Sequence, residues 1–218
     1  MTAIRKTLGL RRNLKEEQRR SQIKEAAINL FSQKGYDQAT MDDLVIEAGI
    51  SKSLIYWYWK SKSALLSELI DTCMTTYTDL LQAGVASDEP YLQKLNRLIW
   101  EFTETFKKND RLNKLVHFCS LHHPKNPDEN FGEQVNTYYQ EVLSLIETIL
   151  TQGIEEGAIK NDVDTKALSL LLLTAVEGFI YMSILEERPP VERILLTTCF
   201  KYLLPGVMAD QNLKKKEL

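Results

Sequence analysis

Residues 40–62 read TMDDLVIEAGISKSLIYWYWKSK, and this stretch decides the fold. Thr40 is a favourable N-cap residue, and the two aspartates that closely follow it favour the first turn of a helix. Gly49 ends that helix, because glycine accepts the left-handed backbone of a C-terminal cap. Ser51 then begins a second short helix, which runs to about Trp59. The sequence therefore predicts two short helices joined by a tight turn.

A longer helix precedes them, from about Glu16 to Gly35. Its apolar residues recur three and four positions apart, which is the spacing of one helix face. Three helices with a glycine-containing turn between the last two make a helix-turn-helix pattern. The apolar face of the first helix consists of Ile23, Ala26, Ala27, Leu30 and Phe31.

The helix that begins at Ser51 has two chemically different sides. One side is mostly apolar, and the other holds a cation, a hydroxyl and two aromatic rings. The second side suits a helix in the major groove of DNA, because it offers donors to phosphate and contacts to base edges. The alternative is that its aromatic rings pack against a following domain. The apolar side holds Leu54, Ile55, Tyr58 and Trp59, and the other holds Lys52, Ser53, Tyr56 and Trp57.

The composition favours a fold made of helices. Among 218 residues there are only 9 glycines and 6 prolines, so few positions interrupt a helix. Three cysteines without a CxxC pair indicate a reducing cytosol rather than a disulfide framework. No strand pattern is present, and we expect an all-α fold of about nine helices. The further helices are expected over about 61–83, 88–108, 111–122, 127–153, 163–187 and 190–204.

Charge divides the chain unevenly. Residues 1–62 carry a net charge of +5, and residues 63–218 carry −8. A basic first quarter suits a head that binds a polyanion, although a solvated basic tail would give the same charge. Residues 1–14 show no helical periodicity and are expected to form a flexible basic arm.

One segment, Ala167–Leu185, is apolar enough to be mistaken for a membrane span. Its single charge, Glu177, would cost about 2.5–3.5 kcal/mol at the centre of a bilayer, and no basic loop flanks it. The first residues of the chain carry positive charge but lack the apolar core of a secretory signal. We therefore expect a buried helix of a cytoplasmic protein without a membrane partner.

A string of residues at fixed spacing covers about a quarter of the chain. It comprises Ala26, Ala27, Leu30, Phe31, Gly35, Tyr36, Ala39, Thr40, Met41, Leu44, Ala48, Gly49, Ile50, Ser51, Lys52, Ile55, Tyr56, Tyr58, Lys60, Lys62, Leu65 and Leu66. This string resembles the DNA-binding domain of TetR-type (tetracycline-repressor-like) transcriptional regulators. Trp57 and Trp59 depart from the His and Phe that are frequent there, and Ser53 departs from the common Gly. The base preference therefore stays open.

The resemblance implies a sequence-specific DNA-binding transcriptional regulator. Its helix-turn-helix DNA-binding domain would span 15–62, and a helical ligand-binding and dimerisation domain would span 63–218. Thr40 and the amide groups at the start of its helix would hold a phosphate. Tyr56 and Lys62 would contact backbone phosphates, which positions the head without reading the sequence. The residues that face the groove would be Ser51, Lys52, Ser53 and Trp57.

Aromatic residues and all three histidines gather in the middle helices of the body. A mostly apolar effector pocket would use such residues, and an aromatic-rich core is the alternative. The histidines lack the spacing of a metal site, so we expect no metal and no cofactor, and the role of His122 and His123 stays open. The pocket candidates are Trp100, Phe102, Phe106, His117, Phe118, Tyr138, Tyr139 and Tyr181.

The helix expected over 163–187 has too many large apolar side chains for one buried side. A core on one side and a second subunit on the other would bury them, with the last helix completing a four-helix interface. The resemblance also implies such a homodimer, whose two heads would contact a near-palindromic DNA operator. The interface candidates are Leu172, Val176, Ile180, Ile194, Phe200 and Leu203.

Three function classes can be compared at this point. The favoured hypothesis is a repressor that a small-molecule inducer releases from its operator. An all-helical enzyme or carrier has little support, because the sequence has no P-loop, GxSxG, HExxH or Rossmann glycine motif, and we expect no enzyme. A non-specific architectural DNA binder is the third class, and it would bind random DNA as well as an operator.

Overall fold

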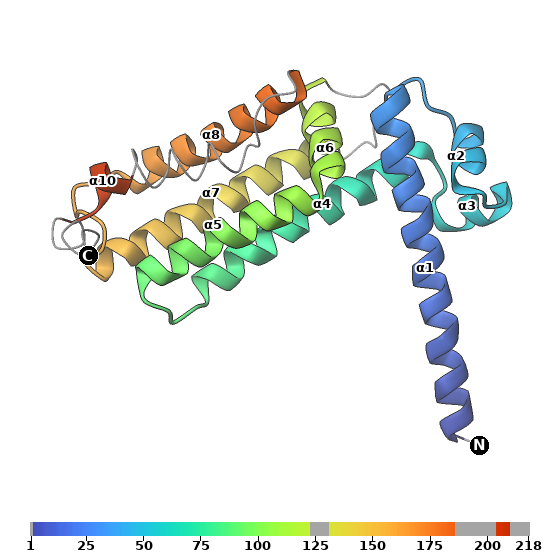
Figure 1. Ribbon diagram of the computed structural model, residues 1–218, viewed down its shortest axis with the longest axis horizontal. Helices are drawn as coiled ribbons and strands as arrows, with labels where there is room; N and C mark the ends of the chain where they lie inside the picture. The colour runs from blue at the N-terminus through green and yellow to red at the C-terminus, as the bar shows by residue number, and fades with distance from the viewer. Residues whose placement is uncertain (1, 123–130, 186–203, 210–218) are drawn as a thin grey trace.

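The computed structural model describes residues 2–122, 131–185 and 204–209, and these ranges form an all-α structure (Figure 1). Its one strand-like feature there is an isolated antiparallel bridge between Ile159 and Met208. The prediction of an all-α fold is confirmed. The helices are α1 (Thr2–Lys34), α2 (Met41–Ala48), α3 (Lys52–Tyr58), α4 (Lys62–Val85), α5 (Tyr91–Lys108), α6 (Asp110–His122), α7 (Phe131–Glu155), α8 (Thr165–Leu185) and α10 (Leu204–Val207).

Local sequence signals set the ends of the short helices. Thr40 caps α2 in a capping box, in which its side chain accepts from the Asp43 backbone and the Asp43 side chain accepts from the Thr40 backbone. Gly49 ends α2 with φ 63°, and Gly35 follows α1 with φ 82°, both in the left-handed region. These are the positions where the sequence predicted helix ends, because glycine has no Cβ to oppose a positive φ.

Helices α1, α2 and α3 form a head at one end of the molecule (Figure 1). Ile23 of α1, Leu44 of α2 and Ile55 of α3 are at most 1% exposed and meet in one core. Trp59, just after α3, closes that core with 3% exposure. The apolar stripes of the three predicted helices therefore pack against one another.

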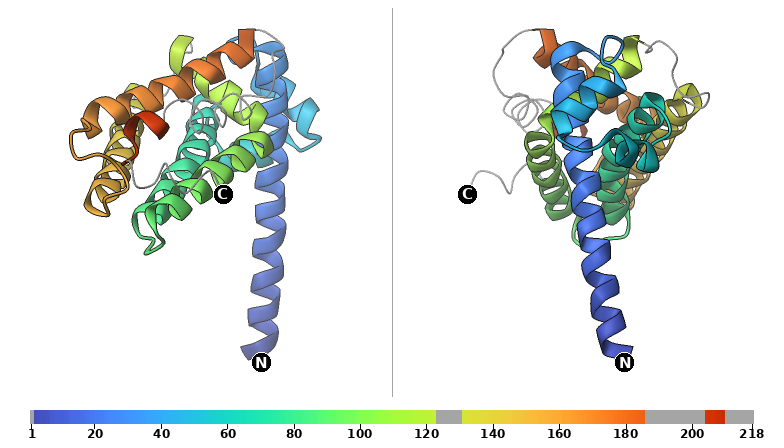
Figure 2. Two further views of the ribbon diagram at one scale, coloured as in Figure 1. Left: turned by 60° about the vertical axis from the view of Figure 1, so that its left-hand side comes forward. Right: turned by 90° about the vertical axis from the view of Figure 1, so that its right-hand side faces the viewer.

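The first helix is longer than expected. It begins at Thr2, so the prediction of a flexible arm without helical structure was wrong for residues 2–14. The N-terminal half of α1 projects away from the rest of the molecule in every view (Figures 1 and 2). A stripe of apolar residues marks the side of a helix that packs against other helices. The N-terminal half of α1 lacks such a stripe, so periodicity could not predict it. Its leucines, arginines and lysines still have good helix propensity, and no proline interrupts them.

The body consists of α4, α5, α7 and α8 lying lengthwise, with α6 set across them near the head (Figure 1). The head core continues without a break into this region, through Leu65 and Leu69 of α4 and through Leu115 of α6. A second core lies at the far end, around Tyr91, Ile149 and Ile159. Helix α4 therefore belongs to the packing of both parts, and the proposed boundary between residues 62 and 63 falls at its first residue.

Helix α8 is long and apolar enough, by length and composition, to cross a bilayer over Thr165–Met182. It packs instead along α7 and α6. Its one charged residue between Ala167 and Leu185, Glu177, is hydrogen-bonded to a histidine of α6. These contacts are those of a helix in a helical body. The helix expected over 190–204 lies almost entirely outside the described residues.

Candidate functional site

The solvent-facing side of α3 carries two large aromatic rings. Trp57 is 61% exposed and Tyr56 is 37% exposed, whereas Ile55, on the opposite side of the helix, is 0% exposed. The Trp57 ring rests edge-on against Tyr58, with ring centroids 4.7 Å apart. Both predicted faces of this helix are therefore placed as expected. The two rings are not covered by other parts of the described chain, which removes the alternative of packing against a following domain.

Three smaller predicted residues share this surface. Ser51, Lys52 and Ser53 are all exposed at the start of α3. The Lys52 ammonium pairs with the Asp42 carboxylate of α2 at 2.6 Å, and this hydrogen bond raises the pKa of Lys52. Because both partners are exposed, the ion pair is weak and the lysine can exchange its carboxylate for a phosphate. The pair holds the cation at the surface of the head.

Thr40 lies at the exposed start of α2, and its hydroxyl is already used within the protein. It donates to Asp43 Oδ2 at 2.8 Å, and the same carboxylate accepts from Lys34 Nζ at 2.6 Å. The bonds from Lys34 and Thr40 lower the pKa of Asp43 to about 2. The carboxylate occupies the helix start that the resemblance assigns to a phosphate.

Asp43→Asn should change how stability depends on pH. The folded-state pKa of Asp43, about 2, lies below its ordinary value of 3.8, so the carboxylate stabilises the fold above about pH 5 and this contribution is lost as the pH falls toward 2. The variant is expected to be less stable than the parent at pH 7, with the difference closing near pH 2. Urea unfolding at a series of pH values measures this. A stability gap that is the same at pH 7 and pH 2 would contradict the assignment.

Lys62 is placed differently from the expectation. Its ammonium donates to the carbonyl oxygens of Tyr36 and Ala39 at 2.7 and 2.8 Å, and it lies 4.2 Å from the centre of the Tyr36 ring. Partial burial lowers the pKa of this lysine. These bonds fasten the link between α1 and α2 to the start of α4. A phosphate contact by Lys62 stays a prediction, and it would have to share an ammonium that already has two acceptors.

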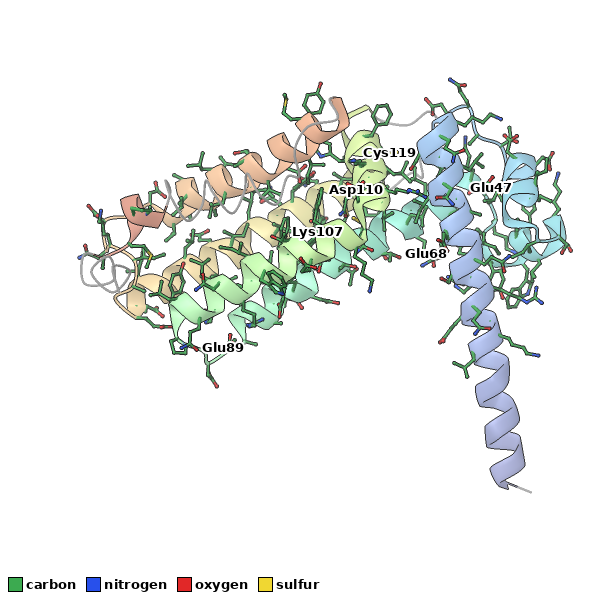
Figure 3. The ribbon with its side chains drawn as sticks, viewed as in Figure 1. Glu47, Glu68, Glu89, Lys107, Asp110 and Cys119 are labelled. Atoms are coloured by element: carbon green, nitrogen blue, oxygen red, sulfur yellow. The ribbon has the colours of Figure 1, made fainter. Side chains whose placement is uncertain are left out.

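A charged cluster behind α3 was not predicted from the sequence. The Glu68 carboxylate of α4 accepts from Arg20 at 2.6 and 2.7 Å, from Trp59 Nε1 at 2.6 Å, and pairs with Lys24 at 2.7 Å. Figure 3 labels Glu68 on α4 beside α1. Burial alone would raise the pKa of this carboxyl, but the hydrogen bonds from Lys24, Arg20 and Trp59 outweigh it and lower the pKa. The cluster ties the end of the candidate DNA-contacting helix to α1 and α4.

A cavity of about 270 Å³ lies in the body between α4, α5, α6, α7 and α8. Four predicted pocket residues are in its wall, namely Phe102, His117, Tyr138 and Tyr139. Most of the remaining wall is aliphatic. The wall residues with polar groups that the prediction omitted are Cys73, Tyr77, Tyr91, Thr103, Asn113 and Glu177.

The other four pocket candidates do not line this cavity. Trp100 and Phe118 are 62% and 46% exposed, so assigning them to the pocket was wrong. Tyr181 is 39% exposed beside the His117 ring, and Phe106 is buried against Phe102. The error has a simple cause. On α5 the residues that face inward are spaced three and four apart, and Trp100 lies on the opposite side of that helix.

One ionisable pair interrupts the apolar wall. His117 Nδ1 and Glu177 Oε2 are 2.6 Å apart, and the histidine side chain is 6% exposed. His117 Nε2 is buried and has no hydrogen-bond partner. Close by, burial raises the pKa of the Cys73 thiol to about 12, and Cys73 donates to Asn113 Oδ1. Burial likewise raises the pKa of Tyr77, Tyr138 and Tyr139, so these hydroxyls stay protonated at neutral pH.

The three histidines are not seen together in the described part of the chain. His117 is in the cavity wall, the backbone of His122 ends α6, and His123 lies outside the described ranges. Within those ranges no group of three or more His, Cys, Asp or Glu side chains could hold a metal ion. The role of His122 and His123 stays open.

The predicted interface residues of α8 lie on its cavity side. Leu172, Val176 and Ile180 line the cavity, and their role in a subunit interface stays a prediction. Helix α8 is apolar on all sides, and its composition therefore does not reveal which face is buried. The other candidates, Ile194, Phe200 and Leu203, lie outside the described residues. The exposed face of α8, called here the α8 stripe, consists of Ala167, Leu170, Leu171, Thr174, Gly178, Tyr181 and Met182.

Comparison with known proteins agrees with the geometry of the head. The profile of "Bacterial regulatory proteins, tetR family" matches residues 23–69. The regulator TtgR of Pseudomonas putida is 26% identical over 183 residues, which cover 78% of this chain and 82% of TtgR. Residues 23–69 are a TetR-family DNA-binding domain.

Other relatives of this TetR-family protein extend the likeness into the body. IcaR of Staphylococcus aureus, a negative transcriptional regulator of the biofilm operon icaADBC, is 24% identical over 155 residues, covering 71% of this chain and 80% of IcaR. The structure of SmeT, repressor of the Stenotrophomonas maltophilia multidrug efflux pump SmeDEF, superposes with a TM-score of 0.72 at 17% identity. That superposition covers 88% of this chain and 91% of SmeT. The protein is a DNA-binding transcriptional regulator of this family.

Proposed function

We propose that this regulator is a homodimeric, cytoplasmic repressor that binds a near-palindromic operator and leaves it when a small molecule fills the body cavity. The observation that carries the proposal is the outward face of α3, where Trp57, Tyr56 and Lys52 stand exposed on the second helix of a helix-turn-helix. Such a helix lies in the major groove and uses its side chains on base edges and phosphates.

Each exposed residue of α3 has a role in this proposal. Lys52 contacts a phosphate after leaving Asp42, and Ser51 and Ser53 offer hydroxyl groups to backbone or bases. Trp57 supplies an apolar surface that suits a thymine methyl group. Tyr56 contacts the backbone through its hydroxyl group. Thr40 and the start of α2 approach a second phosphate, whose charge is opposed by Asp43 and favoured by Lys34.

Helix α6 provides a physical connection between the cavity and the head. Asn113 and His117 are in the cavity wall, whereas Leu115 and Cys119 are buried in the core shared with α1. Figure 3 labels Cys119 on α6 next to α1. Arg111 of α6 also donates to Asn29 of α1 at 2.7 Å. A molecule that displaces α6 therefore displaces α1, and the coupling of ligand and operator is reciprocal in free energy.

The α8 stripe supports the homodimer. It is a continuous apolar face that the single chain leaves exposed, with Leu170 and Leu171 more than half exposed. Faces of this kind in soluble proteins are usually interfaces. Two chains joined through it present two heads to one DNA duplex.

The relatives support the ligand and the location. SmeT has been solved in complex with triclosan, and FadR of Bacillus subtilis in complex with stearoyl-CoA, so chains of this fold hold ligands that have a large apolar part. The relatives reported above are regulators rather than enzymes. The buried free thiols of Cys73 and Cys119 suit a reducing cytoplasm.

Trp57→Ala tests the DNA surface against a matched control, Trp100→Ala. Both tryptophans are about equally exposed, at 61% and 62%, but only Trp57 lies on α3. We expect Trp57→Ala to lower affinity for DNA selected by the parent protein from a random duplex library by on the order of tenfold, and to change the selected sequence. Trp100→Ala should bind like the parent. Fluorescence anisotropy with labelled duplexes measures both.

The salt dependence and a repeated selection complete the test. For the parent, the logarithm of affinity should fall steeply with the logarithm of salt concentration, because phosphate contacts release counterions. Equal affinity for selected and random duplexes would favour the architectural DNA binder instead. A flat salt dependence, or equal losses in both tryptophan variants, would reject the proposed surface.

A further inference from the structure

The polar end of the cavity has an unsatisfied group. His117 is 7% exposed, its ring is part of the cavity wall, and its Nε2 has no hydrogen-bond partner. A buried nitrogen without a partner is rare, because it loses its hydrogen bond to water on folding and gains nothing in return. An orphaned atom in a cavity wall points to a partner that the cavity receives.

The other side of the ring defines the state of this nitrogen. Glu177 Oε2 lies 2.6 Å from Nδ1, and a carboxylate can only accept, so Nδ1 carries a hydrogen. In the neutral ring, Nε2 then offers a lone pair, and in the protonated ring it offers an N–H next to a carboxylate that balances the charge. A weakly acidic partner suits both forms of the ring. Its protonated form donates to the lone pair of the neutral ring, and its deprotonated form accepts from the N–H of the protonated ring.

The rest of the wall narrows the chemistry of that partner. The cavity wall contains no lysine or arginine among the described residues, so His117 is the group there that can carry positive charge. The carboxylate in the cavity wall belongs to Glu177. It is hydrogen-bonded to His117 and lies near the hydroxyl of Tyr139. Beyond this cluster the wall is aliphatic and aromatic, which suits an apolar body.

We infer that the cavity takes an apolar molecule ending in one weakly acidic O–H group, a carboxylic acid or a phenol, and that this group bonds to Nε2 of His117. With a carboxylic acid the proton moves from the ligand oxygen to Nε2, the O–H bond breaks as the N–H bond forms, and the imidazolium then lies between two anions. A phenol is a weaker acid than imidazolium, so it keeps its proton and donates it to the lone pair of Nε2. In both cases the net charge of ligand, His117 and Glu177 together is unchanged. This inference deepens the ligand part of the proposed function and rests on it.

The test compares probes that share one chain and differ at the end group. Decanoic acid, its methyl ester and decylammonium are titrated into the full-length protein at neutral pH, and isothermal titration calorimetry measures each affinity without DNA. At neutral pH the acid is in solution as its carboxylate, so His117 takes up a proton from water on binding and donates its Nε2–H to the carboxylate. We expect the acid to bind about tenfold more tightly than the ester, which has no negative charge to pair with the imidazolium, and more tightly than the ammonium. His117→Phe should bind acid and ester equally well. Phe118→Leu, the adjacent residue outside the cavity, should keep the preference of the parent.

Each outcome decides the matter. Equal binding of acid and ester by the parent, a preference for decylammonium, or an acid preference that survives in His117→Phe overturns the inference. If His117→Phe does not fold, His117→Gln replaces it and should lose most of the preference, and full retention counts against the inference. Binding of none of the probes also overturns it. The proposed repressor function is judged separately, by sequence-specific DNA binding, and can survive any of these failures.

Discussion

Trp59→Ala is expected to lower the free energy of unfolding by about 3–5 kcal/mol, the usual range for a buried tryptophan cut back to alanine. Trp59 is 3% exposed in the core of the head, and its indole N–H donates to Glu68. The Arg20 guanidinium lies 4.9 Å from its ring. The substitution therefore opens a cavity and leaves the charged cluster around Glu68 without one of its donors. Urea unfolding followed by circular dichroism measures the loss.

Trp59→Phe is the matched control. It keeps an aromatic ring in the core but removes the N–H group, so the expected loss is smaller, roughly 1–2 kcal/mol. Phenylalanine is also the residue frequent at this position in the family that the sequence resembles. A Trp59→Phe loss as large as that of Trp59→Ala would mean that the hydrogen bond, and not ring packing, dominates. A loss below 1 kcal/mol for Trp59→Ala would contradict the packing described for the head.

Leu171→Glu is expected to convert the proposed homodimer into a monomer. Leu171 is 52% exposed at the middle of the α8 stripe, and a charge buried against a second subunit without a partner is strongly unfavourable. Light scattering should give the mass of one chain, 25.1 kDa, instead of twice that value. Because one head then binds alone, affinity for a two-half-site operator should fall by on the order of a hundredfold or more.

Trp100→Glu controls for the added charge, since Trp100 is exposed on α5, away from the α8 stripe. It should remain a dimer and bind the operator like the parent. A Leu171→Glu variant that keeps the parent mass would remove the α8 stripe from the interface. A monomer that still binds the operator with parent affinity would instead show that pairing of the heads does not depend on this face.

The helices were predictable wherever their apolar residues face a neighbour. The stripes of α2, α3 and α4 and the left-handed glycines 35 and 49 gave helix positions to within a few residues. The N-terminal half of α1 was missed because a helix without tertiary contacts has no stripe. Sequence patterns report packing more directly than they report backbone conformation.

The candidate sites were predictable only in part. The exposed side of α3 follows from its own periodicity, so Trp57 and Tyr56 were placed correctly. Lys62 bonds to Ala39, 23 residues away, and Glu68 bonds to Arg20, 48 residues away, and no local pattern reveals such contacts. In the cavity, selecting residues by aromatic type admitted Trp100, whereas selection by helix face would have excluded it.

Neighbouring residues of helix α6 belong to two different structures, the wall of the cavity and the core of the head. Asn113 and His117 line the cavity, while Leu115 and Cys119 are buried in the core shared with α1, and Val116 belongs to both sets. Substitutions at 113 and 117 therefore change the wall of the cavity on the same helix whose other side packs against α1. The size and polarity of the cavity and the support of the DNA-binding head are thus set by opposite sides of one thirteen-residue helix.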